Sequence, residues 1–195
     1  MTKKFNLVSP DPNQPISNIQ LEKFILFAIA VAGKKASTIE VAIDTFLSLE
    51  KGISPFWKIR KMMVKNTLVT NLKKARLGRY KVLSKAYSQL VTSNINLRTC
   101  TIEDLENISG IGQKTSRFFI LHTRPKQRLA VLDRYILHYL KHQLHVQNVP
   151  NQTPSSKTVY NRLEKEFINH ADALGISLVE LDSYIWNMYS KYNVL

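Results

Sequence analysis

Two residues of this sequence have the types and the setting for amine chemistry. Lys114 directly follows the stretch Ser109-Gly-Ile-Gly-Gln, and Asp133 follows in Ala130-Val-Leu-Asp133-Arg. A neutral lysine amine can attack a carbon centre and hold it as a Schiff base. A carboxylate can orient or deprotonate such an amine and can stabilise positive charge in the substrate. The pair therefore predicts a catalytic site with Lys114 as the nucleophile and Asp133 as its partner.

The residues around Gly110 predict a short hairpin between two helices. Thr101 and Asp104 have a capping-box pattern that opens the first helix, and two glycines then interrupt the helical periodicity. Glycine removes the Cβ atom that would hold a ligand away, and the first turn of the next helix has free N–H groups. Such a tip suits a phosphate. We therefore expect Gly110, Gly112 and Gln113 to bind a DNA phosphate.

Lys114 and Asp133 each have a simpler interpretation as well. A lysine just after a glycine-rich hairpin is often a phosphate contact, and an aspartate before Arg134 could be only a helix N-cap. The first turn of a helix disfavours the ammonium form of a lysine, which supports the nucleophile. Lysine is also the basic side chain whose pKa falls readily on burial. We favour catalysis because the two residues occur together.

The charge of the chain indicates a polyanionic partner. The formal net charge is +14 and the sequence pI is about 9.9, which is typical of a nucleic-acid-binding domain. Between Glu50 and Glu103 every charged residue is a lysine or an arginine. A stretch of one sign is an electrostatic footprint for DNA, although a solvated basic face or an acidic membrane surface is the alternative. We expect Lys58 and Arg79, within this stretch, to bind phosphates.

The segment from Leu105 to Leu140 resembles the helix-hairpin-helix-GPD superfamily of DNA base-excision glycosylases. The GPD aspartate of that family matches Asp133. Members with a lysine at the position of Lys114 also cleave the strand, so the resemblance implies a glycosylase with lyase activity. Residues 54–59, 76–80 and 181–186 are similar to the 8-oxoguanine glycosylases of archaea and some bacteria.

The last of these patches implies a pocket for an extruded base. Asp182 and Trp186 lie four residues apart, on one face of a helix that Ser177-x-x-Glu180 would open. By resemblance, Phe118 and Trp186 would stack the base while Asp182 accepts hydrogen bonds from a guanine-like edge. The alternatives are that both aromatic residues are core residues and that Asp182 caps a helix or pairs with Lys191.

The periodicity of the chain predicts an all-α fold. Apolar residues recur at three- and four-residue spacings, with no alternating strand pattern, and 195 residues can bury a core without metal or disulfide. The resemblance implies two lobes with an active-site cleft between them. We expect residues 1–51 together with 134–195 to form the terminal lobe. Residues 52–133 would form the central lobe, with the helix-hairpin-helix motif at about 101–122.

We expect no required cofactor. The single Cys100 excludes the four-cysteine iron-sulfur cluster of endonuclease III-like relatives. His138 and His142 lie four residues apart, but no further ligand pattern completes a metal site. A monovalent cation bound by backbone carbonyls of the hairpin is the one ion that we allow for.

The apolar run from Phe24 to Ala32 is too short for a membrane span. We therefore expect no membrane partner. We also expect a monomer, and a cytoplasmic, nucleoid-associated protein if the source is prokaryotic. The partner would be DNA with a damaged base or an abasic site.

Together these features predict a DNA base-excision repair glycosylase with AP lyase activity that removes 8-oxoguanine through a lysine Schiff base. The alternatives are a non-catalytic basic DNA-binding module that keeps the hairpin, and a glycosylase of the same fold for another modified base.

The family's Asn or Gln that fills the gap in the duplex is missing from Ala32-Gly-Lys-Lys35. The chain ends at Leu195, so we do not expect the scheme in which a C-terminal lysine reads the base.

Overall fold

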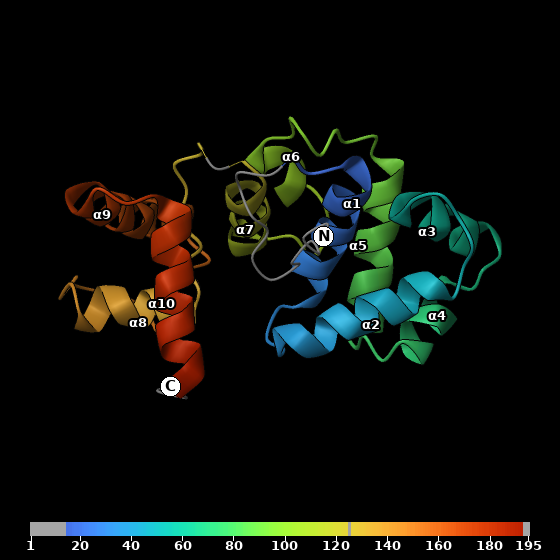
Figure 1. Cartoon of the computed structure of the whole chain (residues 1–195), viewed down its shortest axis with the longest axis horizontal. Helices are drawn as coiled ribbons and strands as arrows, with labels where there is room; N and C mark the ends of the chain where they lie inside the picture. Colours follow the sequence, from blue (N-terminus) through green and yellow to red (C-terminus); the bar gives the residue numbers. More distant parts are fainter. Residues whose placement is uncertain (1–14, 125, 193–195) are drawn as a thin grey trace. The chain divides into compact units, whose positions relative to one another are not determined.

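The computed structural model describes residues 15–124 and 126–192, with side chains described up to Tyr189, and these residues form helices joined by loops (Figure 1). No strand occurs in this part of the chain, so the predicted all-α class is confirmed. The helices are α1 (Asn18–Ala30), α2 (Ala36–Ser48), α3 (Pro55–Val64), α4 (Leu68–Lys74), α5 (Tyr80–Thr92), α6 (Ile102–Glu106), α7 (Gln113–Thr123), α8 (Arg134–His142), α9 (Lys157–Leu174) and α10 (Leu178–Tyr192).

Side-chain caps explain why several of these helices begin where they do. Ser17 and Gln20 form a reciprocal capping box at α1, and Thr101 and Asp104 form another at α6. Each box satisfies two backbone N–H groups that a helix start would otherwise leave without partners. Ser54 caps α3, where proline at the first helical position supplies a suitable backbone angle. The predicted box at Thr101 is thus confirmed, and Ser177 and Glu180 form the one that was predicted for α10.

The chain divides into two compact units between Thr115 and Ser116. In the first unit, α1, α3 and α4 pack against α5, and α2 packs against α1 and α4. The fully buried Tyr87 of α5 ties the unit together, because its hydroxyl donates a 2.8 Å hydrogen bond to the carbonyl of Leu26 in α1. Burial raises the pKa of Tyr87, so this hydroxyl stays a donor.

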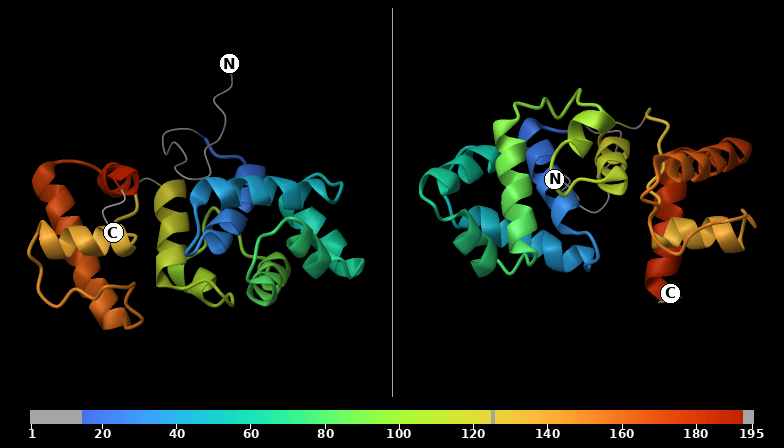
Figure 2. Two further views of the ribbon diagram at one scale, coloured as in Figure 1. Left: turned by 90° about the horizontal axis from the view of Figure 1, so that it is seen from below. Right: turned by 180° about the vertical axis from the view of Figure 1, so that it is seen from behind.

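The second unit is built around α8, α9 and α10, which pack against one another (Figure 2). Its core includes the fully buried Leu163 and Phe167 of α9 and Ile185 of α10. Leu121 of α7 joins this core, as does the loop segment 130–132 that leads into α8. The loop before Asp133 is therefore an interior part of the unit.

The predicted lobes have different boundaries from these two units. Within the first unit, α1 and α2 contact α3 and α4 respectively. A lobe made of residues 1–51 and 134–195 depends on how the two units are arranged, and it stays a prediction.

No helix in the described ranges is both long and apolar enough to cross a membrane.

Candidate active site

The hairpin between α6 and α7 has the glycine geometry that its sequence indicated. Gly110 has a φ of +86°, and a Cβ atom there would lie 3.1 Å from Cγ1 of Val82. The left-handed backbone therefore favours glycine here, and an added Cβ would also press against Val82. A Cβ atom on Gly112 would meet nothing within 4 Å, which leaves open space on that side of the tip. The amide of Ser109 donates to the side-chain oxygen of Gln89 at 2.8 Å and anchors the hairpin on α5.

Lys114 lies in the first turn of α7, as predicted, and its side chain is half-buried. The same helix carries Phe118 one turn later and His122 one turn after that. Residues four apart share one face of a helix, so these three side chains leave α7 on the same side.

Asp133 is the N-cap of α8. Its Oδ1 accepts hydrogen bonds from the backbone amides of Tyr135 at 2.9 Å and Ile136 at 3.0 Å. The simpler interpretation of Asp133 is therefore confirmed as one of its functions. The catalytic interpretation remains compatible with it, because the positive end of a helix suits the negative charge of a carboxylate. The pairing of Asp133 with Lys114 stays a prediction, since the two residues belong to different units.

His122 connects two residues of the predicted base pocket. Its ring centroid lies 4.8 Å from that of Phe118, and its Nε2 lies 3.2 Å from Oδ2 of Asp182 on α10. The histidine itself is only 2% exposed. Sequence reasoning did not include His122, although its four-residue spacing from Phe118 was a signal. Asp182 therefore pairs with a histidine of α7, while the side chain of Lys191 lies outside the described residues.

Trp186 lies one turn beyond Asp182 on α10 and is 37% exposed. An indole that is buried on one side and open on the other can stack on a ligand. The second tryptophan, Trp57 on α3, has the same exposed fraction and holds Lys61 over its ring at 4.3 Å. A role for Phe118, Asp182 and Trp186 in binding a base stays a prediction.

The two predicted phosphate contacts of the basic stretch differ in their surroundings. The ammonium group of Lys58 donates a 2.8 Å hydrogen bond to the carbonyl of Leu47, at the end of α2. Arg79 is exposed, has a left-handed φ of 45°, and immediately precedes α5. Burial and then the charge of Arg79 lower the pKa of Lys34, whose ammonium donates to the carbonyl of Leu77. Arg79 is thus more exposed than Lys58, and a phosphate contact of either residue stays a prediction.

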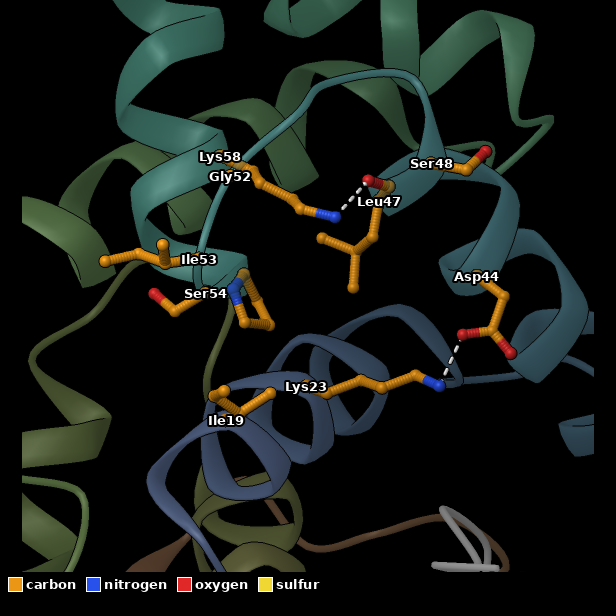
Figure 3. Close-up of a pocket in the computed structure, with 10 residues that line it drawn as sticks. Ile19, Lys23, Asp44, Leu47, Ser48, Gly52, Ile53, Ser54 and Lys58 are labelled. Atoms are coloured by element: carbon orange, nitrogen blue, oxygen red, sulfur yellow. Dashed lines mark hydrogen bonds and ion pairs between the residues drawn. The ribbon is translucent and has the colours of Figure 1, made fainter.

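A hollow of about 290 Å³ lies among α1, α2 and the start of α3 (Figure 3). Its lining includes the Lys23–Asp44 ion pair and Lys58, the latter turned toward Leu47. Lys58 is the one predicted site residue that lines it. Its lining includes none of the residues to which the sequence assigns catalysis or base binding.

Metal ligands do not gather in the described part of the chain, where no group of three or more His, Cys, Asp or Glu residues could hold an ion. His138 and His142 of α8 do lie together, with ring centroids 4.3 Å apart. Burial, followed by the charges of His142 and Lys141, lowers the pKa of His138.

No family model matches the sequence, but comparison with known proteins finds relatives. An 84-residue stretch, 43% of this chain, is 36% identical to the 8-oxoguanine DNA glycosylase/AP lyase of Metallosphaera sedula. The match covers 39% of that protein, so the chain corresponds to well under half of its curated relative.

Solved structures extend the likeness over most of the chain. The 8-oxoguanine glycosylase/lyase of Clostridium acetobutylicum, in complex with DNA containing cytosine opposite 8-oxoG, has a TM-score of 0.68 at 12% identity. That match covers 89% of this chain and 61% of the other. The 8-oxoguanine DNA glycosylase of Thermotoga maritima gives 0.64 at 21% identity, covering 87% and 79%. The Methanocaldococcus jannaschii 8-oxoguanine glycosylase/lyase bound to a 15mer DNA gives 0.64 at 23%, covering 90% and 83%.

The predicted resemblance is therefore confirmed at the level of structure, with a capped helix, a glycine hairpin and a lysine-bearing helix in the expected order. The described part of this chain has the all-helical fold of the 8-oxoguanine DNA glycosylases.

Proposed function

We propose that this chain is a DNA base-excision repair glycosylase with AP lyase activity, and that it removes 8-oxoguanine through a Schiff base on Lys114. The observation that carries the proposal is the position of Lys114. It stands in the first turn of α7, directly after a glycine hairpin, on a fold shared with 8-oxoguanine glycosylase/lyases. A helix start disfavours the ammonium form, and the neutral amine is the nucleophile.

The proposed reaction begins when the Lys114 amine attacks C1′ of the damaged nucleotide. The new C–N bond replaces the glycosidic bond, whose electron pair leaves with the base, and a proton restores the neutral purine. Asp133 takes the proton that the attacking nitrogen loses. The sugar ring then opens to the Schiff base, loss of a C2′ proton expels the 3′ phosphate, and water finally hydrolyses the imine.

DNA binding would come from the hairpin and from the basic surface. The open side of Gly112 and the first amides of α7 suit a phosphate, as a helix N-terminus does. Arg79 and other cations between Glu50 and Glu103 supply the attraction for the polyanion. We include in this proposal a monovalent cation at the hairpin and action as a monomer on nucleoid DNA.

The base pocket would be formed by Phe118, Asp182 and Trp186. The extruded purine would stack between the two aromatic rings, and Asp182 would accept hydrogen bonds from its N–H groups. Support comes from His122, which contacts both Phe118 and Asp182 and so brings two of the three residues to one place.

The decisive experiment is covalent trapping with borohydride on two labelled duplexes, one with 8-oxoguanine and one with an abasic site. We expect trapping on both by the wild type and none by Lys114→Gln. Lys165→Gln, an exposed lysine of α9, is the matched control and should trap normally. Trapping on the abasic duplex alone would support the lyase activity and would mean that the excised base is not 8-oxoguanine.

Absence of trapping on either duplex would favour the non-catalytic DNA-binding module. Affinity measurements separate the two functions of Lys114. Lys114→Gln should bind DNA almost as well as the wild type if the amine is a nucleophile. If it is only a phosphate contact, binding should weaken and its salt dependence should fall.

A further inference from the structure

The segment that leads to Asp133 has no regular secondary structure, yet it is buried. Ala130 and Leu132 are both fully buried, and they lie outside any helix. Backbone N–H and C=O groups in such a segment need partners, because water cannot reach them. Helix α9 supplies most of these partners through its side chains.

Tyr160 of α9 satisfies two of these backbone groups with one hydroxyl. Its O–H donates to the carbonyl of Ala130 at 2.9 Å and accepts from the amide of Leu132 at 3.1 Å. The Leu132 carbonyl, in turn, accepts a 2.8 Å hydrogen bond from the hydroxyl of Thr153. Both backbone polar groups of the residue before Asp133 are therefore held by side chains. Burial raises the pKa of Tyr160, which keeps its proton for the donated bond.

Glu164, one turn further along α9, holds the same segment and α7 at once. Its Oε1 accepts from the amide of Ala130 at 2.8 Å and from Nε of Arg117 at 2.9 Å. The guanidinium carbon of Arg117 also lies 4.3 Å from the ring centroid of Tyr160. Arg117 and Glu164 are both buried, so their ion pair is shielded from solvent. Arg117 lies on α7, three residues after Lys114.

We propose that Tyr160 and Glu164 are positioning residues for catalysis: they fix the backbone that carries Asp133 and join it, through Arg117, to the helix that carries Lys114. This inference rests on the proposed function of Asp133 and Lys114. Both α9 side chains are buried, so neither is exposed to contact a substrate. They act through the backbone of residues 130–132 and through the arginine.

The physical reason is the sensitivity of both hydrogen bonding and catalysis to small displacements. Without the Tyr160 hydroxyl, two buried backbone groups lose a partner, and the segment will move to find others. A shift of about 1 Å in a catalytic group can cost on the order of 100-fold in rate. The Asp133 carboxylate would keep its chemical nature and lose its position.

The test uses Tyr160→Phe, which removes one oxygen and keeps the ring beneath Arg117. Tyr139→Phe is the matched control, because the Tyr139 hydroxyl also makes a hydrogen bond in this unit, to Nε2 of His170 at 2.8 Å. We expect Tyr160→Phe to slow single-turnover cleavage of an abasic duplex by about 10- to 100-fold with unchanged DNA affinity. The control should cleave like the wild type.

A double variant distinguishes positioning from a general loss of structure. If Tyr160 acts through Asp133, Tyr160→Phe should cause no further slowing in an Asp133→Asn background. Equal fold-losses in the two backgrounds would overturn the proposal. Should Tyr160→Phe fail to fold, Glu164→Gln replaces it, since the amide oxygen can still accept from Ala130 while the charge facing Arg117 is lost. A smaller rate loss with the same lack of additivity is expected, because this variant keeps the bond to Ala130 and weakens only the link to Arg117.

Amide hydrogen exchange tests the positioning without relying on activity. The amides of Tyr135 and Ile136 donate to Asp133 Oδ1, so their exchange reports the position of that carboxylate. Tyr160→Phe should speed exchange at both, and Tyr139→Phe should not. Unchanged exchange would overturn the positioning function. A wild type that never traps on DNA would instead defeat the proposed function, while the exchange result would still decide whether α9 fixes Asp133.

Discussion

His122 and Asp182 form a hydrogen-bonded pair between α7 and α10, with Nε2 and Oδ2 3.2 Å apart. When the carboxylate is ionised it can only accept, and Nε2 is then the donor of this hydrogen bond. The other ring nitrogen, Nδ1, is buried and has no hydrogen-bond partner among the described residues. The pair occupies one oxygen of Asp182 and thereby limits how that carboxylate can face a base.

Replacing His122 should therefore affect base recognition more than strand cleavage. We expect His122→Ala to lower the processing of 8-oxoguanine while leaving cleavage at an abasic site nearly intact, because only the former needs an oriented Asp182. The loss of a buried hydrogen bond should also cost about 1–3 kcal/mol of unfolding free energy. His170→Ala, which breaks the pair with Tyr139, is the control for stability alone. The ratio of the two single-turnover rates is the measurement, and an unchanged ratio contradicts the idea.

Trp186 should contribute stacking to the same step. Base-aromatic stacking is worth about 1–3 kcal/mol per base, so Trp186→Ala should weaken lesion processing by roughly one to two orders of magnitude. Abasic DNA has no base to stack and should still be cleaved. Trp57→Ala is the matched control, since both indoles are 37% exposed. Equal losses on both substrates would mean that Trp186 is structural.

The two hairpin glycines allow stability and DNA contact to be separated. Gly110→Ala should destabilise the fold by about 1–2 kcal/mol, the usual cost of a left-handed backbone for an L-residue. Gly112→Ala should leave the unfolding free energy near that of the wild type, because its new Cβ would meet nothing within 4 Å. Weaker DNA binding by folded Gly112→Ala would then report a close phosphate. Normal DNA binding by this variant would contradict a phosphate contact at the hairpin tip.

His138 makes the stability of the second unit sensitive to acid. Its pKa is lowered from 6.5, first by burial and then by His142 and Lys141. The unfolded chain therefore binds this proton more readily than the folded one. The contribution of neutral His138 is fully present above about pH 6.5 and is lost as the pH falls through the folded pKa. His138→Gln should lose less stability than the wild type between pH 7.5 and pH 5 in urea unfolding, and an equal loss in the two proteins would contradict this prediction.

Local signals in the sequence were enough to predict the helices that carry the candidate site. The capping boxes at Thr101 and Ser177 and the glycine hairpin before Lys114 all appear where expected, because each depends on residues close together in the sequence. Asp133 was open to two interpretations. Its helix cap depends on neighbouring residues and can be predicted from them, whereas a catalytic partner of its carboxylate lies far away in the sequence.

Contacts between distant segments could not be read from the sequence in the same way. His122 meets Asp182 across 60 residues, and Glu164 meets Arg117 across 47, so no periodicity connects either pair. Lys58 shows a further limit. A lysine in a basic run looks the same in sequence whether its ammonium faces solvent or, as here, the last carbonyl groups of a helix. Its phosphate contact stays a prediction.

The two tryptophans of the chain, Trp57 and Trp186, fall one in each unit and are equally exposed. Each single-tryptophan variant therefore has one fluorophore whose emission reports one unit. Coincident emission shifts in denaturant would mean that the units unfold together, and separate midpoints would give each its own stability. Quenching of Trp186 by added DNA would show which unit a base approaches, before any chemistry takes place.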